Sequence, residues 1–454
     1  MNRAFSILSC AVLFAVLFLA GPAVARVSVT NDVVFIHHSS GENWLNAGLH
    51  DALTAKSYVN QRNDITYGTA MPPQTGRPAS LGDVPGDLTD MQHWILWFND
   101  YLGTVRTNGC TAGFNQIIMF KSCFPNSDVW ADGSEPGDPF SADRTVANNR
   151  AIYRHPAGPG HSYTNDGCAY QPLGDIFAAH SDTLFIPVIA PPLHFAPEDA
   201  TSDENAHRAR VFNNWLKNKW LASYNAAHPS LNNVAVFDWF DLLAYPDNHP
   251  AHPNRLRAGY GGGSGDSHPN PIACETSTWV FATAPRNVLD AAWHRFRSGS
   301  VNLAPASRGS TITGSNGANW GRLIDGQYGT GQYGHTFWKN AAGAPGQIVL
   351  DLKAARTLTD MRLLLWQPDT RGYGYKIRSS LDGTNWTIVA NVAQGQNRGW
   401  QDLIVNPPRQ ARYLRLTGTS SSAGNIFGVV EWEVYGTAPA GGAAQRAGRL
   451  LVVQ

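Results

Sequence analysis

The stretch Val33–Trp44, VVFIHHSSGENW, decides the fold of the first part of the chain. Four apolar residues suited to a β-strand precede two histidines, two serines and a glycine, and Leu45, Leu49 and Leu53 then recur at helical spacing. A strand that turns sharply into a helix places its turn residues at the carboxyl end of a sheet, beside a helix N-terminus. A serine in that turn can attack an ester carbonyl if a base lies within reach, or it can simply cap the helix.

The same strand pattern recurs along the first domain. The helix expected over residues 202–224 has a capping-box spacing at Thr201 and Glu204. Strands that alternate with helices predict a three-layer α/β domain, flavodoxin-like, with a mostly parallel sheet. Ligands of such sheets bind beyond the carboxyl ends of the strands. The further strands are expected at Ile65–Tyr67, Ile117–Phe120, Phe185–Ile189 and Val234–Asp238.

Composition and the N-terminus indicate the compartment. The formal net charge is +0, so there is no electrostatic case for nucleic acid or an anionic membrane as the main partner. Arg3, an apolar run and Ala23-Val24-Ala25 before Arg26 have the form of a signal peptide over residues 1–25. No later run is long and apolar enough to span a bilayer. We therefore expect a secreted protein, extracellular or periplasmic.

Four cysteines follow the expected cleavage site, which is an even number in an oxidising compartment. Two disulfides are expected and three pairings are possible. The local pair Cys110–Cys123 is favoured, which leaves Cys168–Cys274. A zinc site is the poorer interpretation because the chain has no C-x-x-C pair, and we expect no metal in the first domain.

The composition changes near Ser298. Residues 302–436 contain short β-runs separated by Gly, Asn, Asp and Pro, with no helix of useful length, which predicts an all-β sandwich. Residues 437–454 have the composition of a flexible tail. The expected organisation is therefore a signal peptide, an α/β domain over residues 26–298, a β-sandwich over residues 302–436 and the tail.

Three polar elements of the first domain can meet at one edge of the sheet. They are Ser39 after the first strand, Asn126 in FKSCFPNSD after the third, and the segment Asp266–Asn270, DSHPN, late in the domain. Nucleophilic acyl transfer needs a hydroxyl, an imidazole that accepts its proton and a carboxylate that orients the imidazole. It also needs hydrogen-bond donors aimed at the developing oxyanion.

These residues resemble the SGNH (GDSL-type) hydrolase superfamily over Val33–Phe296. By position, the resemblance implies Ser39 as nucleophile and His268 as base, with Asp266 as the carboxylate that orients it. It further implies that Gly68, in ITYGT, and Asn126 donate to the oxyanion. His37-His38 stands in place of the family's Gly-Asp before the serine.

Two assignments stay open at this point. Ser40 can replace Ser39 as the nucleophile, because both serines lie in the same turn. Asp266 precedes His268 by two positions where the family usually has three, so Asp238 or Asp241 can replace it as the triad acid.

The second domain resembles the discoidin or coagulation factor 5/8 C-type family, a β-jelly roll also used by galactose-type carbohydrate-binding modules. The motifs that carry the resemblance are NLAPAS, LIDGQYGT, TFWKN, IVLDL, IRSSLDGTNWT, ARYLRLTG and VVEWEVYG, in this order. Binding in that family comes from loops at one end of the sandwich. The resemblance also implies a structural Ca²⁺ near Asp325, with no other cofactor required. The glycan-binding candidates are His335, Trp366, Arg371, Tyr373, Asn425 and Phe427.

Together these features predict a secreted carbohydrate esterase whose α/β domain deacylates a polysaccharide, with acetyl as the expected acyl group. The sandwich would keep the enzyme on its polysaccharide or glycoconjugate partner. Two rivals remain. One is a non-catalytic glycan-binding or adhesion protein, and the other is a glycoside hydrolase or polysaccharide lyase that uses histidines or carboxylates of the long loops. The oligomeric state, the sugar and the acyl group do not follow from the sequence.

Overall fold

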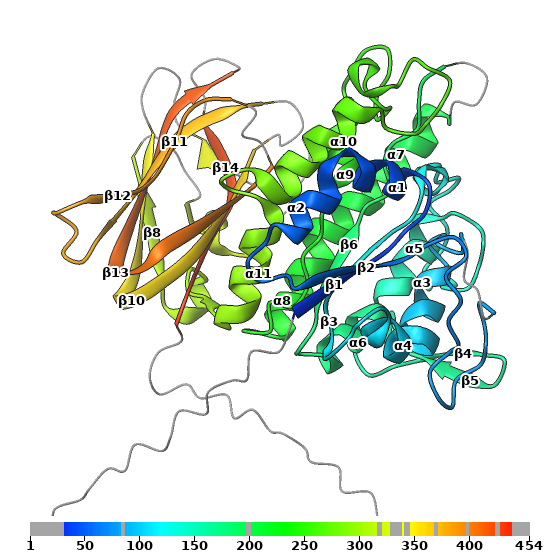
Figure 1. Cartoon of the computed structure of the whole chain (residues 1–454). Coiled ribbons are helices and arrows are strands. Elements are labelled where there is room, and N and C mark those ends of the chain that lie inside the picture. Colours follow the sequence, from blue (N-terminus) through cyan, green and yellow to red (C-terminus); the bar gives the residue numbers. More distant parts are fainter. Residues whose placement is uncertain are drawn as a thin grey trace, which may run out of the picture.

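The structure is a computed structural model that describes residues 31–82, 87–196, 201–315, 320–326, 338–339, 346–366, 371–395, 399–422 and 427–437. The expected signal peptide lies outside these residues, as does all but the first residue of the expected tail. Figure 1 shows an α/β domain beside a β-domain drawn in yellow to red. Within the described ranges, no helix has the length and apolar character needed to cross a membrane.

The first domain is built on a parallel sheet with the strand order β2-β1-β3-β6. These strands span Gln61–Ile65 (β2), Asn31–Ile36 (β1), Phe114–Lys121 (β3) and Leu184–Val188 (β6). The expected strand Val234–Asp238 is present only as parallel bridges from Val234 and Phe237 to β6. The expected strand Ile65–Tyr67 is displaced, because β2 ends at Ile65 and Tyr67 lies in the following turn. The prediction of an α/β domain with a parallel sheet is confirmed.

Helices cover both faces of the sheet because residues of each strand alternate between two cores. Val34 and Ile36 of β1 belong to one core, while Val33 and Phe35 belong to the other. The first core is covered by α3 (His93–Leu96), η2 (Trp97–Tyr101), α4 (Leu102–Thr107), α5 (Val146–Tyr153), α6 (Leu173–Ala179), α7 (Asp203–Asn214), η4 (Trp215–Trp220) and α8 (Leu221–Ala227). The second is covered by α1 (Ser40–Trp44), η1 (Leu45–Leu49), α2 (His50–Thr54), α9 (Trp239–Leu243), α10 (Pro271–Thr278), η6 (Trp279–Thr283) and α11 (Val288–Ser298).

The helix expected over residues 202–224 exists as the continuous series α7, η4 and α8. Its N-cap is Ser202, whose hydroxyl accepts a hydrogen bond from the backbone N–H of Asn205 at 3.1 Å. The cap expected at Thr201 is therefore wrong by one residue, because the Thr201 hydroxyl donates to Asp128 instead.

The second domain is a β-sandwich around one apolar core, as predicted. Its main hydrogen-bonded path runs β12-β11-β13-β10-β14-β7, with β8 paired to β10 and β9 to β14. Trp432 lies in the core and is fully buried. The strands are β7 (Val301–Asn302), β8 (Thr311–Gly314), β9 (Trp338–Lys339), β10 (Gln347–Leu365), β11 (Tyr373–Ser380), β12 (Thr387–Val392), β13 (Trp400–Ser421) and β14 (Gly428–Gly436).

The two domains meet through α11, which contacts β10 and β13 (Figure 1). Asp402 is the centre of the contact. It accepts a hydrogen bond from Arg295 of α11 at 2.6 Å and one from Arg362 of β10 at 3.0 Å. Nearby, the Trp400 indole N–H donates to the side-chain oxygen of Asn218 at 3.2 Å. Moving the domains relative to one another would leave these buried charged groups without partners, which is costly. The interface therefore defines one relative placement of the domains.

Candidate active site

The turn after β1 presents Ser39 at the carboxyl end of a central strand. Its backbone has φ 48 and ψ −105, a region that L-residues with a side chain rarely occupy. Gly41 permits the tight turn, because a Cβ there would lie 2.6 Å from the Cβ of His37. The strained backbone therefore holds the Ser39 side chain in a defined position between the strand and α1.

Ser39, His268 and Asp266 come together although Ser39 and His268 are 229 positions apart in the chain. The Ser39 hydroxyl contacts His268 Nε2, and His268 Nδ1 lies 2.6 Å from Asp266 Oδ1. The backbone N–H of His268 also donates to Asp266 Oδ1 at 3.0 Å. Partial burial raises the pKa of the Asp266 carboxyl, but the hydrogen bonds from His268 outweigh it and hold the pKa below its usual range. This is the arrangement that the hydroxyl–imidazole–carboxylate chemistry requires.

The structure separates the two serines of the turn. Ser40 is fully buried, and its hydroxyl lies 3.4 Å from the sulfur of Cys123. It therefore faces the interior, while Ser39 faces His268. The imidazole also packs edge-on against Phe124, with ring centroids 4.9 Å apart.

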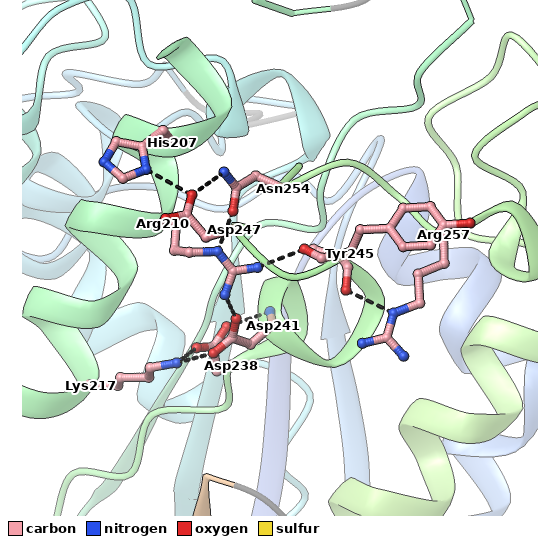
Figure 2. Close-up of polar contacts among 10 residues, drawn as sticks. His207, Arg210, Lys217, Asp238, Asp241, Tyr245, Asp247, Asn254 and Arg257 are labelled. Carbon is pink, nitrogen blue, oxygen red and sulfur yellow. Dashed lines mark hydrogen bonds and ion pairs between the residues drawn. The ribbon is translucent and has the colours of Figure 1, made fainter. Parts of the chain in front are cut away.

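Asp238 and Asp241 are held by other partners (Figure 2). Lys217 contacts both carboxylates, and Arg210 contacts Asp241. Burial raises the pKa of Asp238, with the Lys217 charge opposing it. Among the three carboxylates considered from the sequence, Asp266 is the one that the structure brings to His268.

The two expected oxyanion donors are not equally placed. Asn126 is buried, and its amide donates to Asp90 Oδ1 at 2.7 Å and to the carbonyl of Cys123 at 3.3 Å. Its side-chain oxygen accepts from the backbone N–H of Met91 at 3.0 Å. Both amide hydrogens of Asn126 are therefore engaged within the protein. Gly68, in contrast, lies in the exposed turn after β2 with φ +75, a conformation suited to glycine.

Residues that sequence reasoning did not select surround the turn. The His38 Nδ1 lies 2.6 Å from the Thr89 hydroxyl, and its ring packs against Tyr67 at 5.4 Å. Burial would raise the pKa of Cys123, but the Lys121 charge and hydrogen bonds from His38 and Ser40 reverse this and lower it to about 5. Lys121 is the last residue of β3 and Cys123 lies two positions later, so this period-two spacing is the sequence signal that could have placed the two side chains together.

The expected disulfides are wrong, because all four described cysteines are free. Cys110 precedes β3 and Cys123 follows it, and a strand of 8 residues spans about 26 Å, far beyond the reach of a disulfide. Cys168 packs against the core on one face of the sheet, whereas Cys274 belongs to the core on the other face. Neither pair can be joined without rearranging the domain.

The expected glycan-binding residues of the sandwich divide into three groups. Tyr373 and Phe427 are core residues, 0% and 2% exposed, with ring centroids 5.2 Å apart, so assigning them to a binding loop is wrong. Both rings belong to the apolar core of the sandwich. Trp366 is half-buried and carries the Arg371 guanidinium 4.6 Å above its ring. His335 and Asn425 lie outside the described residues.

Two further acidic residues, Glu431 and Glu433, lie near Asp325, where the resemblance implies a cation. Glu431 is buried, and burial together with the neighbouring charges of Glu433 and Asp325 raises its pKa well above the ordinary value. One of its oxygens accepts from the Gly326 backbone N–H at 3.3 Å, and the other has no hydrogen-bond partner among the described residues. Oxygen donors of this kind suit Ca²⁺. Among the residues that the structure describes, those around Asp325 included, no three His, Cys, Asp or Glu side chains gather into a group that could hold a metal ion.

Comparison with known proteins identifies the second domain. Residues 306–432 match the model of the F5/8 type C domain. Human BTB/POZ domain-containing protein 9 is 31% identical over 113 residues, which are 24% of this chain and 18% of that protein. The sialidase of Micromonospora viridifaciens is 32% identical over 119 residues, 25% of this chain and 18% of the sialidase. The chain thus spans less than a fifth of the length of these curated relatives.

The solved structures that are similar to this part of the chain include two binding modules. Chitosan-binding module 1 of a chitosanase/glucanase from Paenibacillus sp. IK-5 is 29% identical, covering 30% of this chain and 98% of the module with a TM-score of 0.25. A family 32 carbohydrate-binding module of Clostridium perfringens, solved with galactose, is 18% identical, covering 29% and 96% with a TM-score of 0.25. The sandwich is an F5/8 type C domain, as its motifs predicted.

Proposed function

We propose that the chain is a secreted serine esterase that removes acyl groups from a polysaccharide. The observation that supports this is the contact of Ser39 with His268 and of His268 with Asp266, made by residues from the two ends of the α/β domain. The strand order and the position of Ser39 after the first strand further favour an SGNH-type hydrolase with a flavodoxin-like sheet. The signal-peptide pattern of residues 1–25 supports export.

The geometry suits a two-step acyl transfer. The Ser39 oxygen attacks the acyl carbonyl while His268 Nε2 takes the hydroxyl proton. The imidazolium, oriented by Asp266, then returns a proton to the departing sugar oxygen, leaving the acyl group on Ser39. In the second step water attacks the acyl carbonyl while His268 Nε2 takes its proton. The acyl–Ser39 bond then breaks, the imidazolium returns that proton to the Ser39 oxygen, and the free acid leaves.

The oxyanion in both steps needs donors, for which the resemblance proposes Gly68 and Asn126. In the structure both amide hydrogens of Asn126 are engaged, so its participation requires release of the hydrogen bond to Asp90 or Cys123. Apo active sites commonly tighten only when substrate is bound.

The sandwich is proposed to hold the enzyme on its glycan. The match to the F5/8 type C domain and the half-buried Trp366 beside Arg371 support this, because an aromatic ring stacks on sugar C–H surfaces and a guanidinium binds hydroxyls. Asp325 and Glu431 are proposed to hold a structural Ca²⁺, which would neutralise their adjacent carboxyl groups.

One observation favours a second candidate, a glycan-binding protein without catalysis. If Asn126 stays bound to Asp90 and Cys123, the site lacks one of its two proposed oxyanion donors. Such a donor contributes roughly 10²–10³ in rate, so the remaining constellation would be a weak catalyst.

A fluorophosphonate probe separates the two candidates. We expect the full-length protein to be labelled at Ser39 and to hydrolyse a small acyl ester, and we expect Ser39→Ala to lose both properties. Ser40→Ala is the matched control, and it should keep labelling because Ser40 faces the interior. Absence of labelling and hydrolysis in the wild type, with glycan binding retained, would favour the non-catalytic candidate.

A further inference from the structure

A cavity of about 850 Å³ lies between the two domains. The α/β domain contributes the open edge of its sheet at Val236 and the residues Trp279 and Arg286. The sandwich contributes Trp400 and Gln401 from β13. The triad residues do not line this cavity. Its size lies in the range of pockets that hold organic ligands.

The walls of this cavity are held by buried polar contacts. Arg295 and Asp402 are each 9% exposed in their side chains and pair at 2.6 Å across the domain interface. Arg362 forms a second ion pair with the Asp402 carboxylate, at 3.0 Å. Because these buried ion pairs hold the two domains in one arrangement, the shape of the cavity between them is defined.

Two residues of the lining have the properties of ligand-binding groups. The Trp279 side chain is 58% exposed, unusual for a tryptophan. Arg286 is exposed and forms no ion pair with any described residue, whereas the other lining charges are compensated. Lys217 contacts Asp238 and Asp241, and Arg295 and Arg362 contact Asp402. The cavity therefore presents an exposed indole beside one uncompensated positive charge.

Helix α10 connects the candidate active site to the lining of the cavity, which includes Thr276 near the end of the helix. This helix begins at Pro271, just after His268, and ends next to Trp279. Its 8 residues span about 12 Å. Tyr260 also lines the cavity, and its carbonyl accepts a hydrogen bond from the Asn270 backbone N–H at 3.0 Å. A chain-like ligand seated on Trp279 can thus follow one helix to the His268 segment.

We propose that this interdomain cleft binds a segment of an acidic polysaccharide. A sugar ring stacks on Trp279, and a sugar carboxylate pairs with Arg286 through the planar guanidinium fork. The bound chain runs along α10 and presents an acyl group to Ser39. The last step rests on the proposed esterase function, while binding in the cleft does not.

The test uses the full-length Ser39→Ala protein, so that no probe is consumed. Oligosaccharide fragments of polygalacturonate, alginate and hyaluronan are titrated by calorimetry beside neutral fragments of xylan and galactan. We expect at least one acidic series to bind more tightly than the neutral ones. Adding Trp279→Ala or Arg286→Gln should weaken that binding about tenfold, roughly the value of one stacking or charge-assisted contact.

Two control variants locate the site. Trp130→Ala removes another exposed tryptophan, 47% exposed and outside the cleft, and should leave the affinity unchanged. Trp366→Ala removes the aromatic residue proposed to hold the glycan on the sandwich, so any loss of affinity in this variant measures the sandwich site separately from the cleft. The proposal is overturned if no acidic fragment binds, if binding survives both cleft variants, or if only Trp366→Ala abolishes it. Thermal melts confirm that each variant is folded.

A second readout distinguishes failure of the cleft from failure of the esterase. In the protein with Ser39 intact, Trp279→Ala should lower kcat/KM for an acetylated acidic polysaccharide and leave kcat/KM for a small aryl acetate unchanged. Fragment binding without any ester hydrolysis would refute the esterase and keep the cleft. Equal kcat/KM of wild type and Trp279→Ala on the polymer would refute the cleft and keep the esterase.

Discussion

At the scale of single residues, adjacent positions differ sharply in what they can do. Ser39 and Ser40 are neighbours in one turn, yet Ser39 contacts His268 while Ser40 is buried against Cys123. The difference arises from the backbone, because φ 48 at Ser39 rotates its side chain out of the strand–helix turn. Strained conformations of this kind persist only where the surrounding structure imposes them, and they are frequent at functional sites.

This strain makes a prediction about stability. We expect the free energy of unfolding of Ser39→Gly to exceed that of Ser39→Ala by about 1 kcal/mol, because glycine adopts a positive φ without steric cost. Both variants lose the hydroxyl, so neither should label with a fluorophosphonate. Equal free energies of unfolding in urea for the two variants would show that the turn is not strained.

At the scale of elements, the two long strands β10 and β13 of the sandwich are tied by side chains as well as by their backbones. Asp351 of β10 accepts two hydrogen bonds from Arg412 of β13, at 3.0 and 3.1 Å, in a bidentate contact. These hydrogen bonds lower the pKa of Asp351 to about 2. The pair lies at the register shift between Asp351 and Arg356, where backbone pairing is interrupted.

The lowered pKa determines how the contribution of this pair depends on pH. A carboxyl whose pKa is depressed on folding stabilises the protein above its unfolded pKa near 4, and this stabilisation is lost as pH falls toward 2. We expect Asp351→Asn to lower the free energy of unfolding at pH 7 by about 1 kcal/mol, a modest value because Arg412 is partly exposed. The difference should shrink as the pH of the urea titration is lowered from 5 to 2. A difference that is constant over this range would exclude the ion pair as its cause.

At the scale of the whole molecule, buried carboxylates of the sandwich tie it to α11, and Asp402 is the one that is held by two guanidinium groups. Asp402 is buried between Arg295 and Arg362, and these charges keep its pKa low although burial raises it. Removing it would take the carboxylate partner from Arg295 in a desolvated interface, whereas Arg362 also pairs with Glu433 at 3.5 Å. The same interface forms the walls of the cleft proposed to bind the polysaccharide.

We therefore expect Asp402→Ala to destabilise the protein by about 3–5 kcal/mol, the usual cost of removing one partner of a buried ion pair. In calorimetry the wild type should unfold with coupled domains, and the variant should show two separated transitions. The matched control is Asp182→Ala, which breaks the pair with Arg106 at a site where Asp182 is 52% exposed and should cost about 1 kcal/mol or less. A single, unshifted transition in Asp402→Ala would contradict the assignment.

The sequence alone determined the local structure and the domain classes, because these depend on short-range periodicity. The run Val33–Ile36 with its turn predicted a parallel α/β sheet, and the ordered motifs after Asn302 predicted the sandwich that the F5/8 type C match identifies. Only the tertiary structure decided which distant groups meet. It brought Asp266 rather than Asp238 or Asp241 to His268, left the cysteines apart, and turned Tyr373 and Phe427 into the core. Such outcomes follow from the packing of layers across the chain, which no local pattern of residues encodes.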